Sequence, residues 1–201
     1  MAKTVDFFYG IGSRYSYLAA TRMERLAADT GAAVRWRPLW STLLMQRRGM
    51  DPFKGSPASG QYEAAYRTRD VSMWAAYYGI PFRDPDWSKL DWQRLALSAV
   101  TADRLGAAGP YTLRLYNAVF GDGLLPMSDS DLGALADQSG LDGRRLLALI
   151  DDAETQERHE RNIADALAAG VFGVPTFVTD GQLFWGNDRL ILLRHHLGAK
   201  P

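Results

Sequence analysis

Apolar and polar positions follow different periods along the chain, which predicts strands near both ends and helices between them. Residues 4–9 form a short apolar run that ends at Gly10-Ile11-Gly12. Apolar residues at three- and four-residue spacing then predict one helix, which ends at Gly31. Residues 33–37 predict a second strand, closed by Pro38. The chain therefore begins with a β-α-β unit.

From Ser41 to about Gly170 the pattern is helical, apart from a loop at 50–60 that is rich in Pro and Gly. The predicted helices span 42–48, 61–78, 89–106, 110–121, 129–139, 142–150 and 152–169, with Asp142 as an N-cap. Large apolar side chains lie close to one face of the 61–78 helix, at Tyr62, Tyr66, Met73, Trp74 and Tyr77. We interpret this stripe as core packing, with the lining of a pocket as the alternative.

The last part of the chain returns to strands. The runs 175–179 and 182–185 flank Asp180-Gly181, a dipeptide that favours a hairpin turn between apolar strands. A closing helix is predicted at about 188–197. The pattern predicts an α/β protein, a thioredoxin-like fold with a large all-helical insertion. Residues 1–40 plus 170–201 would form the thioredoxin-like domain and 41–169 the inserted helical domain.

Charge and hydropathy narrow the classes of function. The 201 residues include 23 Lys and Arg and 23 Asp and Glu, so the formal net charge is zero. A balanced charge disfavours non-specific electrostatic binding to nucleic acid or to an anionic membrane surface. No apolar run approaches the roughly 18 residues of a membrane span, and the first residues lack a secretory pattern. We therefore predict a cytoplasmic protein without a nucleic-acid or membrane partner.

The chain has no cysteine. This excludes disulfides, thiolate metal sites, a catalytic Cys nucleophile and dithiol redox chemistry by the protein itself. The three histidines are His159, His195 and His196, and the adjacent pair would point in different directions on a helix. That arrangement disfavours a zinc site, so we expect no metal.

Three stretches carry more specific motifs. They are VDFFY followed by SRYSYLA within 5–19, WAAYYGIPF at 74–82, and GVFGVPTFV followed by LFWGNDRL at 170–190. The third is the most specific, because it combines a proline-led strand, a hairpin and an Asp-Arg helix start. In these stretches the chain resembles the DsbA-like thioredoxin superfamily and, within it, kappa-class glutathione transferases and 2-hydroxychromene-2-carboxylate isomerases.

The resemblance makes Ser13 the predicted catalytic residue. Redox members of the superfamily open their first helix with Cys-x-x-Cys, and here that position has Ser13 and Ser16. The resemblance implies that a bound glutathione supplies the sulfur. A helix N-terminus and a hydroxyl both favour a thiolate over a thiol. The alternative is that Ser13 only caps its own helix, worth about 1 kcal/mol. Ser16 is interpreted as structural.

The same resemblance implies the rest of the cofactor site. It predicts a cis bond before Pro175, which turns the backbone of Val174 toward the cysteinyl part of glutathione. A trans proline that opens a strand is the alternative. The Asn187-Asp188 pair would receive the γ-glutamyl ammonium, with N-capping of the last helix as the alternative. The predicted cofactor-binding set is Ser13, Val174, Pro175, Trp185, Gly186, Asn187 and Asp188.

The predicted substrate site takes a small aromatic carboxylate. Trp40, Trp74 and Tyr78 are predicted to line it, and Lys54 in the long loop is predicted to pair with the carboxylate. Two departures from the family pattern stand out: Arg14 replaces a common proline, and residues 47–54 lack a common asparagine.

The resemblance implies a glutathione-dependent isomerase of an aromatic-degradation pathway. In this chemistry a thiolate adds reversibly to a conjugated alkene, so that rotation can occur before elimination. The alternatives are a kappa-like glutathione transferase and a cysteine-less thioredoxin-like binding module. We also expect a homodimer, because the resembled families are dimeric and the predicted insertion is rich in aromatic residues and leucine.

Overall fold

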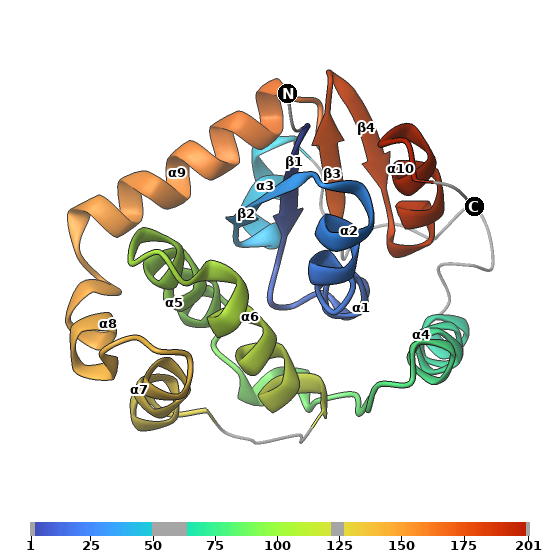
Figure 1. The fold of residues 1–201 in the computed structure, drawn as a ribbon. Helices are drawn as coiled ribbons and strands as arrows, with labels where there is room; N and C mark the ends of the chain where they lie inside the picture. The colour runs from blue at the N-terminus through green and yellow to red at the C-terminus, as the bar shows by residue number, and fades with distance from the viewer. Residues whose placement is uncertain (1–2, 50–63, 122–126, 200–201) are drawn as a thin grey trace.

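The computed structural model describes residues 3–49, 64–121 and 127–199, and contains a four-stranded mixed sheet (Figure 1). The strands are β1 (Thr4–Tyr9), β2 (Ala33–Pro38), β3 (Thr176–Thr179) and β4 (Gln182–Trp185), in the order β2-β1-β3-β4. β1 pairs with β2 in parallel, and β3 is antiparallel to both β1 and β4. The predicted thioredoxin-like α/β fold is confirmed.

The two faces of β1 contribute to two different cores, because successive side chains of a strand point to opposite sides. On one face, the Phe7 ring stacks on Phe177 and Tyr9, with centroid distances of 5.1 and 4.9 Å. On the other face, Phe8 packs with Leu44 and Ile163. Leu44 lies on α3 (Ser41–Arg47) and Ile163 on α9 (Ala153–Ala168).

The single helix predicted before Gly31 is wrong, because the structure has two helices there. They are α1 (Arg14–Ala20) and α2 (Met23–Thr30). Between them the Thr21 hydroxyl donates to the carbonyl of Leu18 at 2.7 Å, and the Arg22 N–H donates to Ala19 at 2.9 Å. These bonds tighten the chain and end α1. Gly31 closes α2 with a φ of 67°, as predicted.

The helical middle follows the predicted order. It contains α4 (Ala64–Tyr78), the 3-10 turn η2 (Trp87–Lys89), α5 (Trp92–Arg104), α6 (Ala108–Tyr116), the π turn η3 (Asn117–Gly121), α7 (Asp129–Gln138) and α8 (Gly143–Leu149). The predicted 89–106 helix begins later, because Asp91 caps α5 by accepting the Arg94 N–H at 2.9 Å. Asp142 caps α8 as predicted, accepting the Arg145 N–H at 3.0 Å.

The helices of the middle contact the sheet directly. The Tyr9 hydroxyl lies 2.7 Å from that of Thr112 on α6, and the Tyr116 hydroxyl donates to the carbonyl of Gly10 at 2.9 Å. Both tyrosines are fully buried. α6 therefore helps to hold the turn that follows β1. The division into a thioredoxin-like domain and an inserted helical domain stays a prediction.

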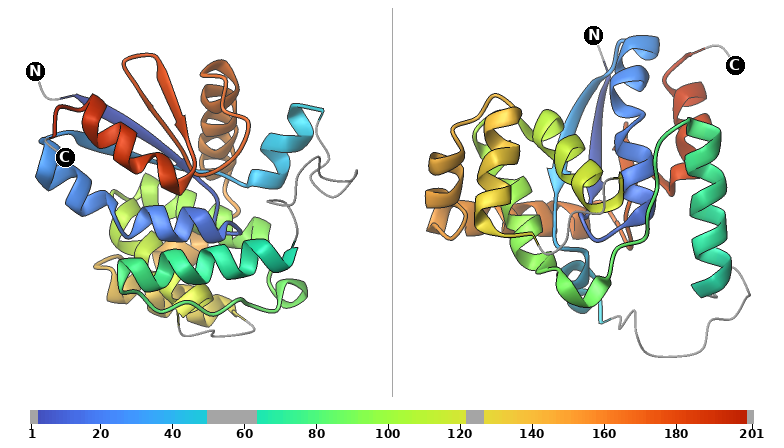
Figure 2. Two further views of the ribbon diagram at one scale, coloured as in Figure 1. Left: turned by 90° about the vertical axis from the view of Figure 1, so that its right-hand side faces the viewer. Right: turned by 90° about the horizontal axis from the view of Figure 1, so that it is seen from below.

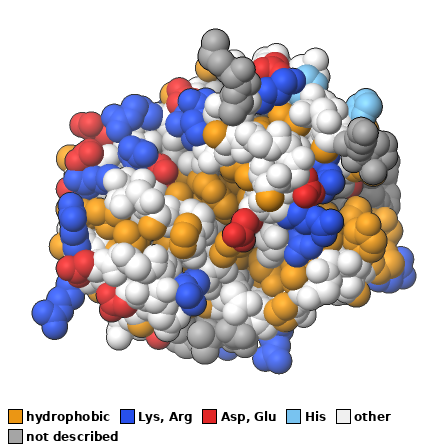
Figure 3. Space-filling model, viewed as in Figure 1, with side chains coloured by type: hydrophobic (Ala, Val, Ile, Leu, Met, Phe, Trp, Pro, Cys, Tyr) orange, Lys and Arg blue, Asp and Glu red, His pale blue; other side chains and the backbone are white. Residues whose placement is uncertain are grey.

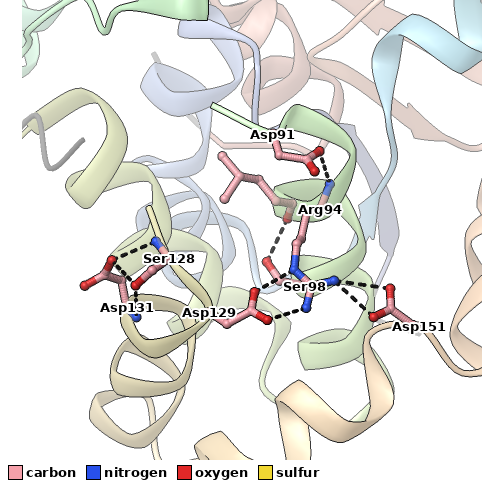
Figure 4. A network of polar contacts seen from close by, with 8 residues as sticks. Asp91, Arg94, Ser98, Ser128, Asp129, Asp131 and Asp151 are labelled. Carbon is pink, nitrogen blue, oxygen red and sulfur yellow. Dashed lines mark hydrogen bonds and ion pairs between the residues drawn. The ribbon is translucent and has the colours of Figure 1, made fainter. Parts of the chain in front are cut away.

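An ion-pair network joins α5 to the ends of α7 and α8 (Figure 4). Arg94 donates to both carboxylate oxygens of Asp129, at 2.6 and 2.7 Å. It also donates to Asp151, at 3.1 and 3.2 Å. This cluster belongs to the group of helices α5–α8 at the lower left of Figure 1.

The predicted hairpin has Asp180 and Gly181 at its tip, both with positive φ. Asp180 forms an ion pair with Lys3 at 2.9 Å, and its carboxylate lies 3.3 Å from His196 Nε2. After β4 the chain forms the 3-10 turn η4 (Asn187–Arg189) and the helix α10 (Leu190–His196). Among the described residues, no helix has the length and hydropathy needed to cross a membrane.

The core-packing interpretation of the 61–78 stripe is wrong for three of its residues. Tyr66, Met73 and Tyr77 are 38%, 53% and 80% exposed. The side of α4 that packs against α1 instead carries Val71 and Ala75, which are almost fully buried with Leu18. Trp74 is partly buried against that cluster, and Tyr62 lies outside the described residues.

Candidate functional site

Ser13 joins the turn after β1 to the segment before β3. Its N–H donates to Gly10, and its Oγ accepts the N–H of Ser16 at 3.1 Å, which caps α1. The same hydroxyl donates to the carbonyl of Val174 at 3.4 Å. That distance is long for an O–H···O bond, so this hydrogen bond is weak. Ser13 therefore caps its helix, as the simpler interpretation predicted, and also contacts Val174.

Val174 and Pro175 are joined by a cis peptide bond, so the alternative of a trans proline is wrong. The carbonyl of Pro175 accepts the N–H of Gly186 at 3.0 Å. Next to it, Trp185 pairs with Thr176 in the β3–β4 register. Four of the predicted cofactor-binding residues thus lie together at the start of the hairpin, and one of them, Val174, contacts Ser13.

The Trp185 indole covers the backbone before Val174. Its ring lies 4.9 Å from that of Phe172, and it remains 41% exposed. A Cβ atom added to Gly173 would lie 2.8 Å from Trp185 Nε1, so only glycine fits there without a shift. Phe172 was not predicted as a site residue, although it lies within the GVFGVPTFV motif.

Asn187 is 2% exposed, and its Oδ1 accepts a hydrogen bond from the Tyr78 hydroxyl at 3.1 Å. Its Nδ2 has no hydrogen-bond partner among the described residues. Burial raises the pKa of Tyr78, so the hydroxyl stays protonated and donates. The alternative that Asn187 or Asp188 caps the last helix is wrong, because no side chain caps η4 or α10. Asp188 forms an ion pair with Arg189 at 3.2 Å.

Three elements meet at Tyr78. It ends α4, Asn187 comes from η4, and Arg22 comes from the break between α1 and α2. The Arg22 guanidinium lies 4.6 Å above the Tyr78 ring, and Trp74 lies 5.6 Å from it. The predicted substrate residues Trp74 and Tyr78 are thus together, and Tyr78 also contacts the predicted cofactor residue Asn187.

The sequence did not predict a second wall beside Ser13. Arg14 donates to both carboxylate oxygens of Asp84, at 2.8 and 2.7 Å, and its guanidinium lies 4.8 Å from the Trp87 ring. Trp87 in turn stacks on Trp92 at 4.8 Å. A Cβ atom on Gly12 would lie 3.1 Å from the Trp92 ring. Only the Pro-to-Arg departure at position 14 hinted at this wall, because its partners are far away in sequence.

No described contact joins Trp40 to Ser13 or Tyr78, so its place in the substrate site stays a prediction. The backbone N–H of Trp40 donates to His159 Nε2 on α9 at 3.0 Å, where Trp40 precedes α3. Burial lowers the pKa of His159, which keeps the ring neutral and able to accept. Lys54 lies outside the described residues.

The chemistry available here is binding and orientation. The site offers the hydroxyl of Ser13, the carbonyl of Val174, the unpaired amide nitrogen of Asn187 and aromatic walls on two sides. The chain has no thiol. A reaction that needs a sulfur nucleophile at Ser13 must therefore receive it from a bound molecule.

Comparison with known proteins places this geometry in a family. The sequence model of the DsbA-like thioredoxin domain matches residues 4–198. The chain belongs to the DsbA-like thioredoxin family. It is 30% identical to 2-hydroxychromene-2-carboxylate isomerase of Sphingobium xenophagum, with 98% of this chain and 99% of that protein covered. It is 26% identical to glutathione S-transferase kappa 2 of Caenorhabditis elegans, with 94% and 88% covered.

A solved structure of a DsbA-like relative agrees with these sequence matches. The structure of 2-hydroxychromene-2-carboxylate isomerase superposes with a TM-score of 0.84 at 28% identity, and 97% of this chain and 94% of that one are covered. The resemblance to this group and to the kappa-class transferases is confirmed. In this DsbA-like chain, the position of the redox motif has Ser13 and Ser16.

Proposed function

We propose that the chain is a glutathione-dependent isomerase that acts on a small aromatic carboxylate of the 2-hydroxychromene-2-carboxylate type. One observation carries the proposal: the Ser13 hydroxyl lies 3.4 Å from the Val174 carbonyl in a chain without cysteine. The site has the backbone arrangement of the redox members of the family, but a hydroxyl stands where they have a thiol. The relatives named as isomerases, aligned over nearly the whole chain, support the reaction class.

The described residues fit a glutathione molecule by their hydrogen-bonding capacity. A buried amide N–H without a partner is costly, and a bound carboxylate or carbonyl oxygen would satisfy Asn187 Nδ2. The Val174 carbonyl has a further lone pair beyond its weak contact with Ser13. Asp188, with its side chain half exposed, would receive an ammonium group. These residues would hold the γ-glutamyl and cysteinyl parts.

When bound, glutathione supplies a thiol that adds to an electron-poor alkene and leaves again. The task of Ser13 is to donate a hydrogen bond from its hydroxyl to the thiolate, which lowers the pKa of the thiol. Because α1 has only seven residues, we assign its effect on the pKa of the thiol to the N–H groups of its first turn and not to a helix macrodipole. The Trp87–Trp92 wall limits access of water beside Gly12 and Ser13.

On the substrate side, we propose that the aromatic carboxylate is contacted by Trp40, Lys54, Trp74 and Tyr78. Arg14 is unsuited to pair with it directly, because Asp84 already holds its guanidinium with two bonds. The remaining parts of the proposal, a cytoplasmic protein that takes part in aromatic catabolism and forms a homodimer, follow from the family resemblance.

A turnover assay separates isomerase from transferase. With catalytic glutathione and an excess of a hydroxychromene carboxylate or a benzylidenepyruvate, we expect many equivalents of product while free thiol stays constant. A loss of thiol that matches product one for one would instead identify a kappa-like transferase. If glutathione binds but neither thiol nor substrate changes, the site is a cysteine-less binding module.

Glutathione binding is tested separately by calorimetric titration of the purified chain. We expect heat from glutathione and competition by S-alkyl glutathione at the same site. Absence of both signals would contradict the cofactor assignment, whatever the outcome of the turnover assay.

A further inference from the structure

The outer edge of β2 carries free backbone groups. β2 pairs with β1 on one side, and within the described residues no strand pairs with its other side. The N–H groups of Ala33 and Leu39 donate toward β1 at 2.9 and 3.0 Å, so the odd-numbered residues of β2 face that strand. The N–H and C=O groups of Val34 and Trp36 therefore point outward, and no described hydrogen bond satisfies them.

A groove with a volume of about 450 Å³ lies along this edge, lined by residues 34–37 of β2. Figure 2 (right) shows β2 on the side of the sheet nearest to α6. The start of α6 forms one wall, with Gly109 and Pro110. A Cβ atom added to Gly109 would lie 3.0 Å from the Trp36 indole, so a side chain there would fill the space between helix and strand. This wall therefore offers apolar surface close to the backbone of β2.

The opposite wall of the groove carries three arginines. Arg35 and Arg37 belong to β2, and Arg158 belongs to α9, which lies at the upper left of Figure 3 among side chains of both charges. Asp103 of α5 accepts from Arg158 at 2.6 Å and is the one acidic residue of the described lining. Each guanidinium donates to a carboxylate through one nitrogen, so further N–H donors remain. Arg37 Nε is buried without a hydrogen-bond partner among the described residues.

We propose that this groove binds an extended, acidic segment of another protein, which adds a strand to the free edge of β2. Val34 and Trp36 each offer one backbone donor and one backbone acceptor to such a strand. Successive side chains of the added strand point to opposite walls, so Asp or Glu at alternate positions would face the arginines. Small apolar residues between them would face Gly109 and Pro110. The expected ligand therefore alternates acidic and apolar residues.

The charge of the edge decides between occupants. Pairing of two β2 strands from two copies of the chain would bring the arginines of one copy close to those of the other, and like charges opposite each other destabilise a sheet. Charged side chains on an edge strand also protect it against aggregation. Protection alone needs neither a groove beside the strand nor a third arginine on α9, and these two features favour an acidic ligand.

The groove is separate from the proposed glutathione site. It lies beyond β2, whereas Val174 precedes β3 and Asn187 follows β4, on the other side of β1. The added strand would end near Pro38, because the outward carbonyl of Pro38 already accepts from the Asn162 side chain at 2.8 Å. Binding at the groove is therefore independent of the proposed reaction, and the two are tested separately.

Fluorescence anisotropy with labelled peptides tests the class of ligand. The probe is a peptide of alternating Glu and Val, and the matched control is a peptide of alternating Lys and Val. We expect micromolar binding of the Glu-Val probe, weakening as salt is added, and no binding of the Lys-Val peptide. Two further probes carry N-methyl groups on all Glu or on all Val residues. Only one of them should lose binding, because alternate N–H groups of an added strand face β2.

Two variants test the residues of the groove. Val34→Pro removes one outward N–H and leaves the bonds to β1 in place, so it should weaken binding of the Glu-Val probe about tenfold. Arg35→Gln should weaken it about threefold. Arg161→Gln is the control, because the Arg161 side chain is 59% exposed, against 62% for Arg35, but does not line the groove. Circular dichroism confirms folding of each variant.

Amide hydrogen exchange of the wild-type chain gives a readout that no variant can disturb. The N–H groups of Val34 and Trp36 should exchange more slowly when the Glu-Val probe is bound, whereas those of Arg35 and Arg37 are protected in both states by β1. Unchanged exchange at Val34 and Trp36, no binding of the probe at millimolar concentration, or equal binding of the Lys-Val peptide would each overturn the proposal. Equal losses in Arg35→Gln and Arg161→Gln would show attraction by net charge instead of binding in the groove.

Discussion

The Tyr78 hydroxyl donates to Asn187 Oδ1 at 3.1 Å across 109 positions of sequence. The bond fixes which end of the Asn187 amide faces Tyr78 and leaves Nδ2 without a partner among the described residues. Because the donor lies on α4 and the acceptor on η4, the helical middle sets the orientation of a residue in the predicted cofactor site.

Tyr78→Phe should therefore weaken glutathione binding more than it affects the chemical step. Losing the donor leaves Oδ1 unpaired and lets the amide rotate, at a cost of about 1 kcal/mol in the free energy of unfolding. We expect the KM for glutathione to rise several-fold with kcat nearly unchanged. Tyr77→Phe, at the adjacent exposed position, is the control and should behave as wild type. Equal KM values in the two variants would contradict the positioning role.

Ser13→Ala separates capping from catalysis when it is compared with Ser128→Ala. Both serines cap a helix, α1 and α7, and each substitution should lower the free energy of unfolding by about 1 kcal/mol. Only Ser13→Ala should raise the pKa of bound glutathione, measured by the ultraviolet absorbance of its thiolate against pH. If both variants keep the same thiolate fraction at neutral pH, Ser13 acts as a cap alone.

Arg14→Met tests the wall beside Ser13. The substitution removes two hydrogen bonds to Asp84 and the contact with Trp87, for a loss of about 1–2 kcal/mol in a half-buried pair. Loosening of the Trp87–Trp92 stack should change tryptophan fluorescence and lower kcat/KM by roughly tenfold. Arg94→Met breaks another forked pair, whose partner Asp129 is not among the residues around Ser13, and it should lower stability without changing kcat/KM. Equal activity losses would show that the effect of Arg14 is general destabilisation.

The buried His159 predicts a pH-dependent stability. Burial lowers its pKa, so below about 6.5 the unfolded chain binds a proton that the folded chain resists. The contribution of the neutral His159 ring to the free energy of unfolding is therefore complete above that pH and declines as the pH falls below it. His159→Gln keeps an acceptor for the Trp40 N–H and does not titrate. Between pH 7.5 and pH 5, the free energy of unfolding measured with denaturant should therefore fall less for the variant than for wild type.

Local patterns were sufficient for the strands and turns. The strands β1 and β2 were predicted from short runs that end at glycine or proline, and the hairpin from Asp180-Gly181, two residues that tolerate positive φ. The break at Thr21 was missed, because apolar spacing continues across it and only hydrogen bonds to Leu18 and Ala19 reveal it.

The site was predictable only in part. The motifs in the chain pointed to Ser13, Val174 and Asn187, and the structure connects the first two directly. Apart from the unusual Arg14 itself, no signal in the sequence indicated its forked bond to Asp84, because the path of the loop that carries Asp84 cannot be predicted from the sequence. Tyr66, Met73 and Tyr77 of α4 were wrongly expected in the core for a related reason: helical periodicity identifies an apolar face of a helix but not what packs against it.

The pairing of β1 with β3 has a consequence for synthesis in the cell. Phe7 lies opposite Phe177, so the central pair of the sheet joins β1 to a segment that is synthesised about 170 residues later. Until then β1 can pair with β2 alone, and its other edge stays open to wrong partners. We expect a nascent chain stalled before Thr176 to remain sensitive to protease and to bind chaperones. Release of only a few more residues, through Trp185, would complete the sheet.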